Sequence, residues 1–206
     1  MSLSMELGVT GIPFAAIAAF AVVTSSTPGP NNLLLTYSGL AFGFRKTLPA
    51  FAGVYLGCCV LFLFCALGIS ALVTSTPLAR PALGYLGGAY LAYMGWRMLG
   101  TQWTGTAAPR PVRCASAALM QLVNPKLWWM CAFTLARFAP ADAPVSTLTV
   151  VAATFMLFTV PALTAYTLLG SMITRFAGSS TLRLAVNRAL ALATLITAVL
   201  VVVGAQ

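Results

Sequence analysis

The sequence predicts an all-α integral membrane protein, with six transmembrane helices arranged as two inverted three-helix repeats. The first observation is composition, because 60% of the 206 residues are hydrophobic and only 6% are charged. Soluble domains carry about 25% charged residues. The second is the length of the apolar stretches, which suits helices that cross a bilayer. The third is a proline motif inside two of them, which predicts that helices 1 and 4 are broken.

Six apolar stretches define the predicted spans, and prolines interrupt the first and fourth in their middle. Lipid offers backbone groups no hydrogen-bond partners, so a break at membrane depth must be buried in protein or line a wet cavity. The predicted spans are residues 12–43 with a break at 27–30, 48–73, 82–99, 114–138 with a break at 124–126, 147–172 and 184–204.

The chain divides into two halves of similar layout within one transporter domain, residues 1–206. Each half, approximately 1–100 and 113–206, begins with a broken span and continues with two unbroken ones. The proline-bearing segment 100–113 is the longest loop and is the predicted linker. Because three is an odd number of spans, the second half must be inverted relative to the first, as in many secondary transporters.

Basic residues gather on one side of this topology. The loops after spans one, three and five hold Arg45, Lys46, Arg97, Arg110, Arg113, Arg175, Arg183 and Arg188, and the opposite side holds Arg80 and Arg137. Positive charge stays cytoplasmic, which predicts that both termini face outward. The two acidic residues, Glu6 and Asp142, fall on that outer side.

The first break, Thr27-Pro28-Gly29-Pro30-Asn31-Asn32, combines helix breakers with amide side chains. Proline suits the first position of a helix, so Pro30 is expected to start a half-helix. Gly29 lets the backbone approach a ligand closely. Asn31 and Asn32 add hydrogen-bond donors and acceptors at the same place.

The second break, Asn124-Pro125-Lys126, adds a charge. Pro125 is expected to start the second half-helix, with Asn124 as its cap. The amino end of a helix carries partial positive charge and binds anions such as carboxylates. Lys126 lies about halfway along its span, and a charge at that depth indicates a functional site. The competing interpretation is that the prolines only kink the helices and that Lys126 reaches the interface.

Together the two breaks predict a site for a small zwitterion. Its carboxylate would contact Lys126 and one helix end, and its ammonium would contact freed carbonyls and asparagine side chains. Gly57 is expected either to leave room for the solute beside the first break or to serve close helix packing. The predicted substrate-binding residues are Thr27, Pro28, Gly29, Pro30, Asn31, Asn32, Gly57, Asn124, Pro125 and Lys126.

Other functional classes find little support in the sequence. The net charge of +9 lies mainly at span ends, which argues for membrane orientation and against a nucleic-acid partner. The chain has no histidine, and its five cysteines lack metal-ligand spacing, so neither a metal nor another cofactor is expected. Acid–base catalysis has few candidate groups, and an enzyme is not expected. A passive channel remains an alternative, and a homodimer is left open.

The order of the motifs resembles the LysE/RhtB family of bacterial amino-acid exporters. The most specific part is the first break, followed by Gly43-Phe44-Arg45. Gly53-x-x-x-Gly57 and Gln121-Leu122-Val123-Asn124-Pro125-Lys126 support it, as do Gly87-Gly88-Ala89-Tyr90-Leu91 and Gly95-Trp96-Arg97. Within the family, the chain is most similar to the branch that exports cysteine and O-acetylserine. The resemblance implies an inner-membrane protein that exports small amino acids, usually with the proton gradient.

One departure from the family affects the expected coupling. Many relatives carry an acidic residue directly after the glycine at position 57, where this chain has Cys58. No predicted span contains Asp or Glu, so a carboxylate proton relay is excluded. If transport is coupled to protons, Lys126 is the best candidate for the proton site. Uniport and exchange stay open.

Overall fold

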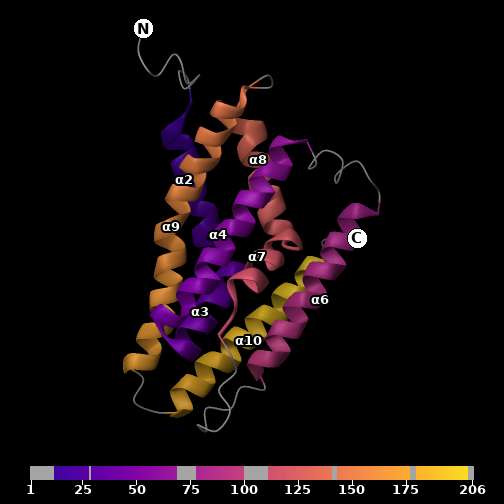
Figure 1. Ribbon diagram of the computed structural model, residues 1–206. Helices are drawn as coiled ribbons and strands as arrows, with labels where there is room; N and C mark the ends of the chain where they lie inside the picture. Colours follow the sequence, from indigo (N-terminus) through magenta and orange to yellow (C-terminus); the bar gives the residue numbers. More distant parts are fainter. Residues whose placement is uncertain are drawn as a thin grey trace.

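The structure is a computed structural model that describes residues 12–27, 29–68, 78–99, 111–140, 143–176 and 180–203. Regular structure within these ranges is entirely helical (Figure 1). The helices are α2 (Phe14–Ser26), α3 (Pro30–Phe42), α4 (Phe44–Ala66), α6 (Ala79–Leu99), α7 (Cys114–Leu122), α8 (Pro125–Phe138), α9 (Val145–Phe176) and α10 (Ser180–Val203).

Both predicted breaks are present. The first expected span is divided into α2 and α3, and the fourth into α7 and α8. Pro30 and Pro125 each occupy the start of the second half-helix, as expected from their missing N–H groups. The second interruption lies at Val123 and Asn124, slightly before the predicted 124–126, because Pro125 already belongs to α8.

Other boundaries differ from the predicted ones by several residues. Helix α4 begins at Phe44 and ends at Ala66, although the predicted span was 48–73. Helix α9 is longer than predicted and continues through Pro161. The linker is described only from residue 111 onward, and Glu6, Pro28, Arg110 and Asp142 lie outside the described residues.

Three of the described helices are long and apolar enough to cross a bilayer by themselves, namely Phe44–Ala66 and the segments Val145–Ile173 and Leu184–Val203. The half-helices are shorter, and α2 is an apolar helix of 13 residues. Eight helices are therefore described where six spans are predicted, two of those spans being split. The six-span topology and the inverted repeat stay predictions.

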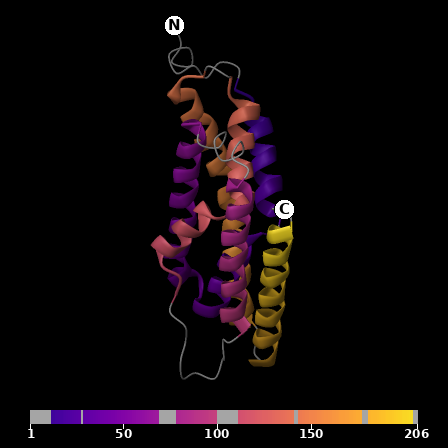
Figure 2. The same ribbon diagram turned by 90° about the vertical axis from the view of Figure 1, so that its right-hand side faces the viewer.

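The helices form an elongated bundle (Figures 1 and 2). Helix α9 packs along both α2 and α3, while α4 packs along both α7 and α8. Each broken span thus packs against the long helix that the sequence assigns to the other half. Helices α6 and α10 form a closely packed pair that contacts α3 through α10.

Glycines let several of these helices approach closely. A Cβ atom added to Gly170 of α9 would lie 2.1 Å from the carbonyl oxygen of Thr36 in α3. A Cβ added to Gly39 of α3 would lie 2.4 Å from the carbonyl oxygen of Thr167 in α9. Such distances exclude a side chain, so the α3–α9 contact depends on both glycines.

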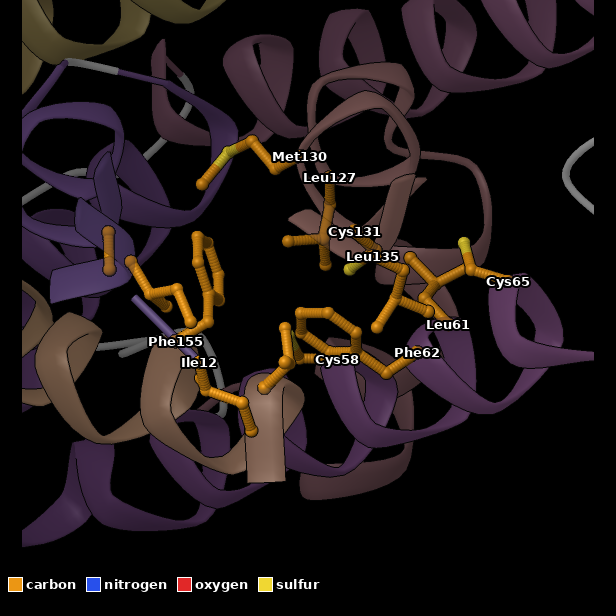
Figure 3. Packing of buried hydrophobic residues seen from close by; sticks show 13 residues of the cluster. Ile12, Cys58, Leu61, Phe62, Cys65, Leu127, Met130, Cys131, Leu135 and Phe155 are labelled. Atoms are coloured by element: carbon orange, nitrogen blue, oxygen red, sulfur yellow. The ribbon is translucent and has the colours of Figure 1, made fainter. Parts of the chain in front are cut away.

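The largest hydrophobic cluster lies where α2, α4, α8 and α9 meet (Figure 3). Phe155, Leu61 and Cys131 in this cluster are almost fully buried. Phe20 packs beside the cluster and contacts four aromatic rings, including Phe133 at a centroid distance of 4.9 Å. This packing fixes α8 against α4, and so helps to position the second break.

Candidate functional site

The two breaks meet at one cavity. Its volume is about 510 Å³, part of which is open to the outside. Polar lining residues come mainly from α2 and the two breaks, and apolar side chains of α4, α8 and α9 line the rest. The polar set comprises Thr24, Ser25, Asn31, Asn32, Tyr55, Asn124, Lys126 and Thr159, and the apolar set includes Val54, Cys58, Leu127, Met130, Phe155 and Leu163.

Lys126 joins the two breaks directly. It belongs to the first turn of α8, and its Nζ donates a hydrogen bond of 2.8 Å to the carbonyl oxygen of Thr27. A Cβ added to Gly29 would lie 3.2 Å from both Cδ and Nζ of Lys126. The absence of a side chain at position 29 therefore lets the lysine lie against the backbone of the first break.

Side chains from three helices satisfy the carbonyl end of α2. Asn32 of α3 donates to the carbonyl oxygens of Ser25 at 2.8 Å and Thr27 at 3.1 Å. The hydroxyl of Tyr166 in α9 donates to the carbonyl oxygen of Ser26 at 2.8 Å. With Lys126 from α8, these groups replace partners that a continuous helix would supply.

The start of α3 presents backbone donors to the same space. Gly29 is extended, and the first bond of the α-helical pattern runs from the Leu33 N–H to the Gly29 carbonyl at 3.0 Å. The N–H groups of Asn31 and Asn32 come before this first bonded N–H, so no carbonyl within α3 accepts a hydrogen bond from them. Asn31 and Asn32 both line the cavity, so an anion there would meet a helix amino end and the Lys126 ammonium.

Asn124 behaves differently from the predicted helix cap. It occupies the cap position of α8, but its side chain makes no capping hydrogen bond. Its Nδ2 instead points to Oδ1 of Asn31, at 3.5 Å. The residue is only 5% exposed, and its Oδ1 has no hydrogen-bond partner among the described residues. The second break therefore brings a buried, unused acceptor to the cavity wall.

Gly57 lies away from the cavity lining. A Cβ added to it would lie 2.4 Å from Cγ of Gln121 and 2.6 Å from the carbonyl oxygen of Ala118. Its position serves the close approach of α4 and α7, which is the packing alternative considered for it.

Thr27 and Pro125, two further predicted site residues, do not line the cavity. Thr27 contributes its carbonyl to Lys126, Pro125 starts α8, and Pro28 is outside the described residues.

Sequence reasoning missed several residues that build the site. Tyr166 satisfies the end of α2, and Trp128 satisfies the end of α7 by donating from Nε1 to the Leu122 carbonyl at 2.8 Å. Tyr55 lines the cavity, with its hydroxyl 3.0 Å from Oγ1 of Thr159. Tyr55 and Tyr166 lie within helices, and nothing in their local sequence distinguishes them from interface aromatics. Trp128 is different, because its place directly after the second break sets it apart from an interface aromatic.

Within the part of the chain that the structure describes, Lys126 is the only charged residue that lines the cavity. The remaining polar side chains there are neutral amides and hydroxyls, and the other lining side chains are apolar. The arrangement can hold a small anion or zwitterion in an environment of low dielectric constant, where a single ammonium attracts a carboxylate strongly.

Comparison with known proteins gives named relatives. The chain is 34% identical over 121 residues to the cysteine/O-acetylserine efflux protein of Shigella flexneri serotype 5b, covering 57% of this chain and 61% of the relative. It is 31% identical over 128 residues to the leucine efflux protein of Enterobacter sp. strain 638, covering 59% and 60%. The chain thus spans about three-fifths of the length of these relatives. No solved structure gives a significant match.

The family model described as LysE type translocator matches residues 22–205, which include both breaks and every helix from α3 to α10. Its extent agrees with the apolar helices of a multi-pass membrane protein. The chain belongs to the LysE family of translocators.

Proposed function

We propose that this chain is a secondary transporter that exports small neutral amino acids or their derivatives across the bacterial inner membrane. Cysteine, O-acetylserine and threonine are the substrates of the expected size and charge. Family membership and the two efflux relatives support the class of function. The observation that carries the proposal is the cavity in which Lys126 contacts the first break and Asn124 faces Asn31.

The carboxylate of the substrate binds between Lys126 and the amino end of α3. Both supply positive charge, one as an ammonium and the other as backbone N–H groups. Lys126 donates one N–H to the Thr27 carbonyl, and its other N–H donors remain for the carboxylate.

The ammonium of the substrate is accepted by Oδ1 of Asn124. Among the described residues this oxygen is buried without a partner, a state that costs about 1–3 kcal/mol. A substrate ammonium relieves that cost and gains a hydrogen bond to a charged group. An α-hydroxy acid, which lacks the ammonium, would gain less.

The side chain of the substrate lies against apolar lining residues. Val54, Met130 and Phe155 are among them, and they offer no charged partner for an ionised side chain. A neutral side chain enters with little desolvation cost, whereas a second charge would be buried unpaired. The cavity therefore favours neutral amino acids over basic or acidic ones.

Lys126 is also the proposed site of proton coupling, because no carboxylate is among the described residues that line the cavity. In this scheme the lysine is charged when it holds the substrate and loses its proton when the site is empty. A Lys126→Arg variant tests the scheme, since arginine stays protonated. Full proton-driven flux in that variant would exclude the relay and leave uniport or exchange.

The function is tested by efflux of radiolabelled amino acids from cells with and without the protein. The panel contains cysteine, O-acetylserine, threonine, homoserine and lysine. We expect saturable efflux of the neutral substrates, abolished by Lys126→Met and retained by Lys46→Met. Lys46 is the matched control because it is the only other lysine and is exposed at the start of α4.

Two outcomes would contradict the proposal. The first is equal efflux in the presence and absence of the protein for every amino acid in the panel. The second is flux in reconstituted vesicles that rises linearly with concentration and is not competed by unlabelled substrate, which would indicate a passive channel.

A further inference from the structure

A pair of thiols lies in the wall of the cavity. Cys58 of α4 lines the cavity and is 8% exposed, while Cys131 of α8 lies behind it and is fully buried. Helices α4 and α8, which carry the two thiols, pack against each other. Both belong to the hydrophobic cluster shown in Figure 3, where they are labelled.

The pair connects elements that the sequence assigns to opposite halves of the chain. Helix α4 comes from the first half, and α8 follows the second break and carries Lys126. Cys131 is five residues beyond Lys126 on the same helix, so a covalent bond at Cys131 would restrain the segment that holds the lysine. Transport by alternating access needs the two halves to move relative to each other.

We propose that Cys58 and Cys131 form a dithiol site that small-molecule disulfides oxidise from the cavity, and that the resulting disulfide stops transport. The effect on transport rests on the proposed function, whereas the thiol chemistry does not.

The reaction is a thiol–disulfide exchange in two steps. Cys58 loses its proton and its sulfur attacks one sulfur of R–S–S–R, which gives a mixed disulfide and releases R–SH with that proton. Cys131 then attacks the Cys58 sulfur, which closes the Cys58–Cys131 bond and releases the second R–SH with the Cys131 proton. The protein loses two hydrogens, and the small disulfide is reduced to two thiols.

The positions of the two cysteines give them distinct roles. Only Cys58 lines the cavity, so it is the thiol that meets the incoming disulfide. Cys131 is 0% exposed and reaches the reaction only through Cys58. A disulfide needs the two Cβ atoms about 3.5–4.5 Å apart, so oxidation requires the packed helices α4 and α8 to bring them to that distance.

Two other cysteines provide controls. Cys59 is exposed, its Sγ lies 3.7 Å from Sδ of Met156 in α9, and it does not line the cavity. Cys65 is buried on the same side of α4 and belongs to the same cluster, which makes it the competing partner for Cys131.

The test uses the full chain in proteoliposomes treated with hydroxyethyl disulfide, a small neutral reagent. Mass spectrometry of the intact protein and its peptides should show loss of two hydrogens and a link between the α4 and α8 peptides. Cys131→Ala should instead trap the mixed disulfide on Cys58, and Cys58→Ser should give neither product. Cys59→Ser should react like the parent protein.

Amino-acid flux is measured on the same vesicles. We expect oxidation to lower flux about tenfold in the parent protein and in Cys59→Ser, because a covalent bond blocks a motion that transport requires. Dithiothreitol should restore it, and flux through Cys58→Ser should not respond to the reagent.

A link between Cys65 and Cys131, no link at all, or unchanged flux despite a complete Cys58–Cys131 link would each overturn the inference. Failure of the proposed function is distinguishable, because the reduced parent protein would then carry no amino-acid flux.

Discussion

Lys126 has two roles at the scale of a single side chain. It is the positive charge of the cavity, and it donates to the Thr27 carbonyl at the end of α2. Its contacts explain why a lysine can remain at this depth, since the break offers a carbonyl oxygen that a continuous helix would use internally. The sequence indicated the charge and its depth, but the Thr27 partner depends on the packing of α8 against α2.

Asn124 allows the ammonium part of the proposed site to be tested. Asn124→Leu removes the unpartnered Oδ1 at similar size, and the loss of a hydrogen bond to a charged group costs about 1.5–3 kcal/mol. We therefore expect the KM for an exported amino acid to rise about tenfold or more. The matched measurement uses the corresponding α-hydroxy acid, whose weaker transport should be nearly unchanged by the substitution. An equal effect on both compounds would argue that Asn124 is structural.

Substitution of Tyr166 should have a smaller effect, because Tyr166 contacts the end of α2 but does not line the cavity. Tyr166→Phe removes the hydrogen bond to the Ser26 carbonyl and should cost about 1 kcal/mol. We expect a melting temperature lower by a few degrees in detergent and a modest loss of substrate affinity. Tyr85→Phe, at an exposed position of α6, is the control and should leave both quantities unchanged. A parent-like Tyr166→Phe would show that Asn32 and Lys126 hold the break alone.

At the scale of the helices, the two proline motifs predicted the breaks, whereas a single proline within an apolar stretch does not predict a break. Pro49 and Pro161 lie inside α4 and α9, and both helices continue through them. The true breaks combine proline with another residue that favours ending or restarting a helix, namely Gly29 in the first and Asn124 in the second. The sequence could not indicate that Tyr166 would satisfy a freed carbonyl of α2, because it lies 140 residues from Ser26 along the chain.

The α3–α9 contact can be tested by filling it. Gly170→Leu would place side-chain atoms where the Thr36 carbonyl oxygen already lies, so the two helices must separate. Overpacking of this kind typically costs about 1–3 kcal/mol, and thermal unfolding should show the loss. Ala165→Leu adds bulk to an exposed position of α9 and should have little effect. Equal stability of the two variants would contradict the close approach.

At the scale of the whole molecule, basic residues gather at one end of the bundle. The end of α6, the start of α4 and the end of α9 lie at the lower end of Figure 1 and contain Arg97, Arg45, Lys46 and Arg175. The end of α8, with Arg137, lies at the opposite end. This distribution agrees with the loop assignment made from the sequence, and the orientation in the membrane stays a prediction.

Labelling of introduced cysteines in intact cells measures that orientation. In a variant without the native cysteines, Thr76→Cys lies between α4 and α6, and Thr104→Cys lies between α6 and α7. A membrane-impermeant maleimide should label position 76 from outside, and position 104 only after the membrane is opened, because the basic loops stay cytoplasmic. The reverse pattern would invert the predicted topology.

Composition and proline motifs were enough to predict the class, the helical fold and the meeting of the two breaks. They could not separate packing from binding at Gly57, which the structure places against Gln121. They also could not predict that the Asn124 side chain contacts Asn31 and makes no capping hydrogen bond, since this contact depends on how the two breaks pack together. Interactions between helices carry this information, and no local pattern contains it.

The bond from Lys126 to the Thr27 carbonyl uses only one of the N–H donors of this ammonium. Because a lysine has three such donors, the same side chain can hold the end of α2 and a carboxylate in the cavity at once.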